Sequence, residues 1–406
     1  MAIDKIEYLE IEGKSKAYYA LLALFGVFMV IGWSAAHYMD SHGHHVSGMN
    51  NQIVWGVPHI FAIFLIIAAS GALNVASIAS VFGKTAYKPL APLSALLAIA
   101  LLVGGLMILV LDLGRPERFW YPLIYINPKS VFTWNMLLYS VFIGLVAIYL
   151  WFMLEKRMSR YTNLVGFFAF LWRLLLTTGT GSIFGFLVAR QAYDTAVMAP
   201  LFVLMSFAFG MAVFILVLLA IYRFSHRPLG DHLLMRLRTL LGIFVSAVFY
   251  FVLVYHLTNL YATERHAVEK FILLEGGIYT VLFWVVQIGM GSIIPLLLLY
   301  LPNFKKCRLT LTIAALLVIC GAFAQLYIII IGGQAFPLVL FPGMEVQSTF
   351  MDGVVANYTP SLWEFLLGLG GVALALFIVI FGIKVLRILP ESLDDVVVEA
   401  QAEKNT

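Results

Sequence analysis

The chain has 406 residues, of which 62% are hydrophobic and only 11% are charged, and its mean hydropathy is +0.98. Soluble globular proteins do not reach such values, so the composition predicts a protein that crosses a lipid bilayer several times. The net charge of +4 does not indicate a polyanionic partner such as nucleic acid. In such chains the distribution of Lys and Arg reflects how the chain is oriented in the membrane. Two cysteines, Cys307 and Cys320, are too few to hold an iron–sulfur cluster or a c-type haem on this chain.

Ten segments are long and apolar enough to span a membrane. An α-helix rises about 1.5 Å per residue, so roughly 20 apolar residues cross the roughly 30 Å hydrocarbon layer. The expected spans are residues 17–39, 53–81, 89–112, 131–154, 163–188, 196–222, 233–258, 276–301, 309–332 and 361–387. The predicted fold class is therefore an all-α integral membrane protein with ten transmembrane helices.

Lys and Arg are distributed unevenly between the two sets of loops. The chain ends and the loops on their side hold 18 of these residues, the alternate loops hold 6, and Arg173 lies within a span. Because loops rich in Lys and Arg stay in the cytoplasm, both termini are expected to be cytoplasmic. The predicted location is the cytoplasmic (inner) membrane, with the alternate loops on its outer face.

A basic residue followed by Pro-Leu precedes both span three and span seven. Lys88-Pro89-Leu90 recurs as Arg227-Pro228-Leu229, 139 residues later. This offset indicates two parallel four-helix repeats, with a flanking helix at each end, although chance recurrence explains it equally well. The expected units are residues 1–52 with the first helix, 53–190 as the first bundle, 191–335 as the second bundle, and 336–406 with an outer loop, the tenth helix and a cytoplasmic tail.

Ionisable residues gather near the outer ends of the spans. His59 lies about two turns into span two, Asp112 ends span three, Glu364 begins span ten, and Arg190 and His256 end spans five and seven. Charged groups are costly in a membrane, at about 2.5–3.5 kcal/mol each at the centre of a span. Five such residues on one face therefore indicate a functional site there.

Asp112 and Arg115 stand on either side of a helix end, because Pro116 cannot continue the helix. One interpretation is an interfacial salt bridge between the two side chains. In the other, the carboxylate and the guanidinium flank a quinone headgroup, whose reduction or oxidation moves two protons. The two interpretations are compatible.

His59 follows Pro58, which can open the hydrogen-bond ladder of the helix and leave room for a bound group. The sequence leaves three roles open for this histidine. It is a quinone ligand or proton carrier, a histidine satisfied by packing, or one of two axial ligands of a single b-type haem, with His256 as the other.

Arg173 lies near the middle of span five and is followed along the helix by Thr177, Thr178, Thr180 and Ser182. Hydroxyl groups three or four residues apart can form a polar strip. In one interpretation Arg173 and Thr180 belong to a proton path toward the outer site. In the other, the small residues allow close helix packing.

Span seven ends with a second group of polar residues. Tyr255, His256 and Asn259 are candidates for a polar pocket in the second bundle, and an aromatic belt with an exposed histidine is the alternative. No metal site is expected. The outer loops 114–130 and 333–360 are long enough to dock a partner.

Several motifs together resemble a known family. The run Asp112-Leu113-Gly114-Arg115-Pro116-Glu117-Arg118-Phe119, followed by Pro128-Lys129-Ser130 and Trp134, resembles the NrfD/PsrC family of quinone-interacting membrane subunits. The likeness extends through residues 178–185 and reappears at residues 331–337 and 358–361 with Glu364. Ten spans and the late motifs are most similar to the DsrP branch of the DsrMKJOP complex, and next to HybB-type hydrogenase subunits.

The resemblance implies a quinone pocket near the outer face of the first bundle, with exchangeable menaquinone or ubiquinone and neither haem nor an iron–sulfur cluster on this chain. It implies an extracytoplasmic ferredoxin-like iron–sulfur subunit, a multihaem cytochrome c, and further membrane and cytoplasmic subunits as partners. One residue departs from the pattern, since Thr177 stands where several relatives have histidine. A role that depends on that histidine is not expected here.

The leading hypothesis is a quinone/quinol-interacting subunit of a respiratory redox complex in sulfur (sulfite or sulfate) metabolism. It is either non-catalytic alone or a quinone oxidoreductase subunit of the larger complex. His59 and Asp112 are the expected headgroup ligands or proton carriers, and Arg115 is their electrostatic partner. The alternatives are a cofactor-free anchor or ion-translocating subunit, and a b-type cytochrome.

Overall fold

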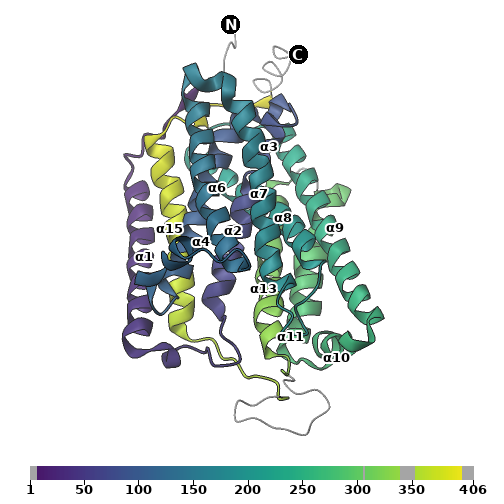
Figure 1. The fold of residues 1–406 in the computed structure, drawn as a ribbon. Helices are drawn as coiled ribbons and strands as arrows, with labels where there is room; N and C mark the ends of the chain where they lie inside the picture. Colours follow the sequence, from purple (N-terminus) through teal and green to yellow (C-terminus); the bar gives the residue numbers. More distant parts are fainter. Residues whose placement is uncertain (1–6, 305–306, 339–352, 396–406) are drawn as a thin grey trace.

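The computed structural model describes residues 7–304, 307–338 and 353–395. Within these residues, ten helical stretches have the length and composition of membrane spans, which confirms the predicted all-α fold (Figure 1). They are Lys16–His42, Val57–Ser80, Thr85–Leu111, Val131–Leu154, Lys156–Gly185, Met198–Phe224, Asp231–Tyr261, Ile278–Tyr300, Arg308–Ala335 and Leu362–Val385. The predicted outer loop and tail fall partly on residues 339–352 and 396–406, which lie outside the described residues.

The spans are built from individual helices whose bounds are as follows. The α-helices are α1 (Lys16–His42), α2 (Val57–Ala72), α3 (Asn74–Ser80), α4 (Ala91–Leu111), α5 (Tyr121–Ile124), α6 (Val131–Leu154), α7 (Thr162–Gly185), α8 (Met198–Phe224), α9 (Asp231–Tyr261), α10 (His266–Lys270), α11 (Ile278–Val281), α12 (Ile294–Tyr300), α13 (Arg308–Tyr327), α14 (Gly333–Ala335) and α15 (Leu362–Val385). The π-helices are η6 (Phe271–Glu275), η7 (Leu282–Ile293) and η9 (Ile328–Gly332). The 3-10 helices are η1 (His44–Val46), η2 (Thr85–Leu90), η3 (Pro116–Arg118), η4 (Lys156–Tyr161), η5 (Thr263–Arg265) and η8 (Pro302–Phe304), and the strands are β1 (Tyr8–Leu9) and β2 (Leu389–Pro390).

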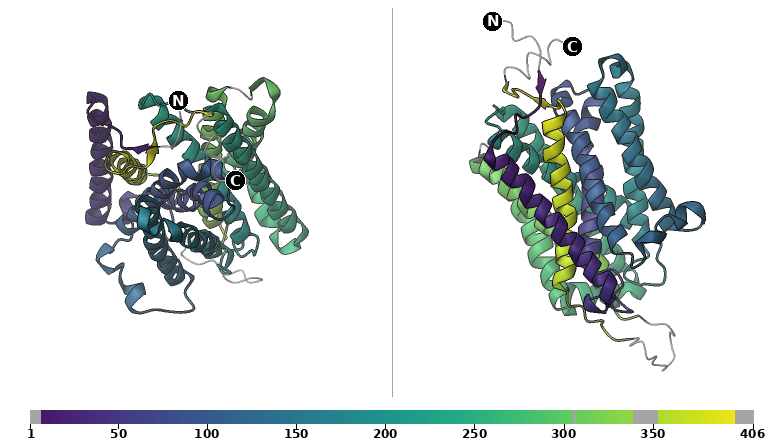
Figure 2. Two further views of the ribbon diagram at one scale, coloured as in Figure 1. Left: turned by 90° about the horizontal axis from the view of Figure 1, so that it is seen from above. Right: turned by 90° about the vertical axis from the view of Figure 1, so that its left-hand side faces the viewer.

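The helices form two rings of four spans. In the first ring α2 packs on α4, α4 on α6, α6 on α7, and α7 on α2 and α3. In the second ring α8 packs on α9 and α13, while α12 and η7 pack on both α9 and α13. Helix α1 lies along α15, which packs against α4 and α2 at the side of the first ring (Figures 1 and 2). The residue boundaries predicted for the units, and the predicted repeat, stay predictions.

The two rings meet where α2 crosses α8 and where α7 packs on α8, and at Gly71 and Gly210 the contact of α2 with α8 is made by backbone. A Cβ atom on Gly71 would overlap the carbonyl oxygen of Ser206, and a Cβ atom on Gly210 would overlap the backbone of Gly71. Only glycine allows two helices to approach so closely, which is typical of helix contacts in membranes.

Two spans depart most from a regular α-helix, and span nine includes the shorter π-helix η9 near its end. Span two is interrupted at Leu73, which separates α2 from α3, and most of span eight is the twelve-residue π-helix η7. A wider helix leaves some backbone groups with altered partners and often occurs at functional sites. None of these irregularities was predicted from the sequence.

Both chain ends lie at the same end of the molecule, which we call the proximal end; the opposite end is the distal end (Figure 1). There β1 pairs with β2 in antiparallel register, with Tyr8 opposite Pro390. The guanidinium of Arg227 donates to the carbonyl oxygens of Glu10 and Leu389, at 2.9 and 3.3 Å. These contacts form a clasp between the two chain ends.

Candidate quinone site at the distal end

A cavity of about 680 Å³ lies among the distal ends of α2, α4, α6 and α7. Its walls include His59 and Asp112, together with Arg115 from the segment that follows α4. The volume is that of a site for a small organic ligand. Three of the predicted site residues therefore line one cavity.

The closest pair of ionisable groups in this cavity is His59 and Asp112. The His59 Nδ1 atom lies 3.1 Å from a carboxylate oxygen of Asp112, whose side chain is only 1% exposed, against 22% for His59. The angles of this contact do not make a hydrogen bond, and neither Asp112 oxygen has a donor among the described residues. A buried carboxylate without donors is costly, so it is suited to a bound molecule that supplies an O–H group.

The predicted salt bridge between Asp112 and Arg115 is wrong. Within the described part of the chain the ion-pair partner of Asp112 is His59, and Arg115 lies beyond 4 Å. The reason is the turn at Gly114, whose φ of +64° takes the chain sharply away from the end of α4. Arg115 still lines the cavity, so its positive charge faces the same space.

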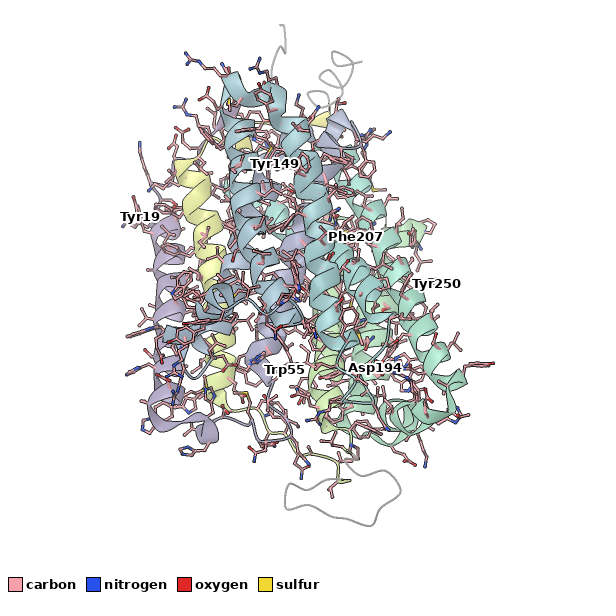
Figure 3. All side chains as sticks on the ribbon, viewed as in Figure 1. Tyr19, Trp55, Tyr149, Asp194, Phe207 and Tyr250 are labelled. Atoms are coloured by element: carbon pink, nitrogen blue, oxygen red, sulfur yellow. The ribbon has the colours of Figure 1, made fainter. Side chains whose placement is uncertain are left out.

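One wall of the cavity is aromatic. Trp55, which Figure 3 labels near the distal end, lies with its ring centroid 6.1 Å from Phe132 and 5.8 Å from Phe184. The Trp55 ring is also 6.2 Å from the His59 imidazole. Edge and offset contacts of this kind form a rigid apolar surface on which a flat ring can pack.

Two polar residues of α6 complete the cavity and were missed in the sequence. The Tyr139 hydroxyl lies 3.0 Å from Thr180 Oγ1 and donates to it, because the Thr180 hydroxyl itself donates to Leu176 O. The Asn135 side-chain nitrogen donates to Gly179 O at 2.9 Å, while its oxygen has no donor among the described residues. Their spacing of four residues within an apolar span was the signal that could have identified them.

Arg173 lies deep in the protein but outside this cavity. Its side chain is buried between the rings of Phe170 and Phe207, with its charge centre 4.9 and 5.1 Å from their centroids. One of its nitrogens donates to Ser70 O at 3.4 Å. Among the ion pairs of the described residues, none involves Arg173.

The hydroxyl groups that follow Arg173 do not form one continuous strip. Thr177 and Thr180 are buried, but Thr178 is exposed. Each of the two buried hydroxyls donates to a carbonyl of its own helix at 2.9 Å, and Gly181 lies against the backbone of Ala199. This geometry favours close packing of α7 on α8. A proton path through Arg173 and Thr180 stays a prediction.

Glu364 is fully buried at the start of α15, and the structure does not bring it into the cavity. Its carboxylate accepts hydrogen bonds from Ser361 N at 2.6 Å, Gly48 N at 3.1 Å and the Tyr358 hydroxyl at 2.7 Å. Burial and the nearby Glu364 carboxylate both raise the pKa of Tyr358 above its ordinary value. Glu364 therefore caps α15 and ties two distal loops together.

The polar residues of the second bundle surround a buried carboxylate. His256 Nδ1 lies 2.7 Å from Glu269, and the Asn259 amide donates to the other Glu269 oxygen at 2.8 Å. Tyr255 donates to Ala192 O at 3.3 Å and lines, with His256, a small cavity of about 30 Å³. The alternative of an exposed histidine is wrong, because the His256 side chain is 11% exposed. Glu269 lies in α10, between the expected spans 233–258 and 276–301, and was not among the candidates.

The structure places the remaining candidates apart from one another. His59 and His256 line different cavities in different bundles, so they do not face each other as a haem-ligand pair. Arg190 lies beyond α7 and donates to the carbonyl oxygens of Gln334 and Gln52. Within the described ranges, no three His, Cys, Asp or Glu side chains converge in a way that could hold a metal ion.

These features define a multi-pass integral membrane protein with a polar and aromatic cavity near one end of its first bundle. The sequence model of the NrfD family, described as polysulphide reductase NrfD, matches residues 45–338. The chain belongs to this family, which confirms the resemblance. Its placement in a DsrP-like branch stays a prediction.

Three curated relatives are similar to this chain over most of their length. A protein of Archaeoglobus fulgidus named Hdr-like menaquinol oxidoreductase integral membrane subunit is 29% identical over 97% of this chain and 99% of its own length. A selenate reductase subunit of Mesobacillus selenatarsenatis is 25% identical over 89% of this chain and 92% of its own. A polysulfide reductase subunit of Wolinella succinogenes is 26% identical over 70% of this chain and 96% of its own.

Proposed function

We propose that this chain is a quinone/quinol-interacting membrane subunit of a respiratory redox complex. It exchanges electrons between the quinone pool and iron–sulfur or haem centres on partner subunits. The observation that carries the proposal is the His59–Asp112 pair, which faces the distal cavity and whose carboxylate oxygens lack hydrogen-bond donors among the described residues.

The residues of the cavity fit a quinone. The aromatic wall of Trp55, Phe132 and Phe184 suits a flat ring, and the volume of about 680 Å³ suits a headgroup with part of a tail. The unpaired oxygens of Asp112 and Asn135 suit the hydroxyl groups of a quinol. A bound quinone supplies chemistry that moves two electrons and two protons.

The side chains of the site divide the proton transfer between them. Asp112 accepts a hydrogen bond from the ligand and takes its proton, and His59, 3.1 Å away and more exposed, passes the proton outward. The guanidinium of Arg115 lines the same cavity and supplies a positive charge beside the ligand. Tyr139, held by its hydrogen bond with Thr180, orients the inner end of the ligand, and Arg173 lies deeper along α7 between Phe170 and Phe207.

The relatives support a more specific version of the proposal. The word menaquinol in the name of the Archaeoglobus fulgidus relative favours menaquinone. The partners are an iron–sulfur subunit on the distal face, a multihaem cytochrome c, and other membrane and cytoplasmic subunits, in a DsrP-like complex of sulfur metabolism. The protein lies in the cytoplasmic membrane with both termini in the cytoplasm.

The proposal is tested by Asp112→Asn in the native complex. The amide cannot take a proton, so quinol-dependent electron transfer is expected to fall at least about tenfold while assembly is retained. Glu117→Gln is the matched control, because Glu117 lies five residues away and is 68% exposed. Full turnover with quinol in an assembled Asp112→Asn complex, or the absence of quinone in solvent extracts of the purified complex, would contradict the proposal.

A further inference from the structure

The segment between α4 and α6, residues 113–130, stands away from the rest of the first bundle. It contains η3 and α5. Both views of Figure 2 show this blue segment projecting sideways from the neighbouring helices. In the right-hand view it lies at a level short of the distal ends of α1 and α15. The segment therefore lies at the same level as the membrane-spanning helices and does not extend past their distal ends.

Beside exposed charged residues such as Glu117, this segment carries a group of strongly exposed apolar and aromatic side chains. The exposed fractions are 55% for Trp120, 66% for Ile124, 74% for Tyr125 and 63% for Ile126. Single exposed apolar residues are ordinary, but a continuous group of this kind requires a cover. Trp and Tyr are the residues that gather at the boundary between lipid and water.

The same apolar surface continues onto a membrane-spanning helix. On α6, next in the chain, Phe132, Trp134 and Leu137 are 52%, 51% and 39% exposed. Lipid that covers α6 therefore lies close to the segment, with the exposed Asn127 and Lys129 between them in the chain. Arg118 and Lys129, at either side of α5, have long side chains that can extend to lipid phosphates.

The segment also has an inner face. Arg118, Phe119 and Pro122 line the distal cavity, so the segment lies between the cavity and the surroundings of the bundle. We propose that residues 113–130 are immersed in lipid at the distal membrane boundary, where they form the lipid-side wall under which an apolar-tailed ligand enters the cavity. The entry route rests on the proposed function, whereas the immersion does not.

Immersion is tested with a fluorescent probe on a single cysteine in the full chain. Cys307 and Cys320 are replaced by serine, Ile124→Cys is labelled with an environment-sensitive dye, and the complex is placed in liposomes. Lipids that carry a nitroxide are expected to quench the dye strongly, and aqueous iodide weakly. Leu137→Cys on α6 provides the lipid reference, and Glu264→Cys in η5 provides the distal aqueous reference.

Two results would overturn the immersion. In the first, iodide quenches the dye at position 124 as strongly as it quenches the dye at position 264. In the second, the complex protects the dye from both quenchers, which indicates that a partner protein covers the segment. Neither result bears on the roles of His59 and Asp112.

The entry route is tested with Ile124→Glu, because a carboxylate in this wall repels an apolar tail. The KM for a long-tailed quinol is expected to rise several-fold, with the KM for a tail-less quinol and both kcat values unchanged. Ile124→Leu is the control for packing and assembly. An equal change in KM for both quinols, or no change for either, would show that the tail does not pass this segment.

Discussion

A carboxylate that is 1% exposed and has no donor among the described residues, such as that of Asp112, is destabilised until something completes its hydrogen bonds. Its contact with His59 at 3.1 Å brings the two side chains together without hydrogen-bond geometry. The site is therefore arranged around a ligand and not around an internal salt bridge. The buried Glu269 of the second bundle is the opposite case, because His256 and Asn259 engage both of its oxygens.

Tyr139 offers a test at the scale of one hydroxyl group. Tyr139→Phe removes the hydroxyl that faces the cavity and bonds to Thr180. Because a hydrogen bond contributes about 0.5–1.5 kcal/mol, turnover with quinol is expected to fall several-fold with little loss of assembly. The measurement is steady-state quinol oxidation by the purified complex.

Tyr149 provides the matched control for this substitution. It lies on the same helix, is buried, and donates to Ala76 O at 3.3 Å, but it does not line the cavity. Tyr149→Phe is expected to lower thermal stability slightly and to leave turnover unchanged. Equal turnover defects in both variants would indicate a general packing effect and would remove Tyr139 from the site.

At the scale of helices, hydropathy was sufficient to predict the spans. The expected span 131–154 coincides with α6, and the expected span 309–332 begins one residue from α13. The break at Leu73 and the π-helix η7 could not be predicted in this way, because a change of hydrogen-bond partner leaves composition unaltered.

The sequence also could not show which side chains from different helices lie next to each other. Asp112 and Arg115 are neighbours in the chain and suggested a local salt bridge, but α4 ends beside α2, and His59 supplies the contact. Asn135 and Tyr139 were missed because a spacing of four residues identifies a shared helix face without identifying what that face meets. The order in which helices pack around a bundle depends on the whole fold and cannot be read from a short sequence motif.

The contact between α2 and α8 predicts which glycines are sensitive to substitution. Gly71→Ala places a methyl group against the carbonyl of Ser206, so the two helices must separate. The expected cost is about 1–3 kcal/mol of stability, observed as a lower unfolding temperature in detergent. Gly144→Ala on α6 is the control, since a Cβ atom there meets nothing within 4 Å. A cost as large for Gly144→Ala as for Gly71→Ala would refute the proposed role of the contact.

At the scale of the whole molecule, the clasp joins the two ends of the chain. Burial raises the pKa of Tyr8 in this clasp to about 12, from an ordinary value of 10.0. The closed clasp favours the neutral phenol, so its stability is complete below about pH 10 and is lost as the pH rises through 12.

This pH dependence can be measured by limited proteolysis between about pH 9 and pH 12 with a protease that is active at alkaline pH. Cleavage near residues 7–11 is expected to increase across this range, as the charged phenol of Tyr8 favours the open clasp. Tyr8→Phe removes the titrating group, so its cleavage should not rise in the same window. An identical rise in the Phe variant would assign the effect to another group.

The backbone contact between Gly71 and Gly210 also limits how the protein can move. Many transporters work by alternating access, in which one helical unit rocks against another across a surface of side chains that repack. Where Gly71 meets Gly210 the two backbones touch, so sliding of α2 on α8 breaks this contact and also disturbs side-chain pairs such as Phe64 with Phe209. This close approach therefore opposes rocking of one bundle against the other. Such a contact suits a subunit that must hold a ligand at a constant distance from redox centres on its neighbours, because the rate of electron transfer depends steeply on that distance.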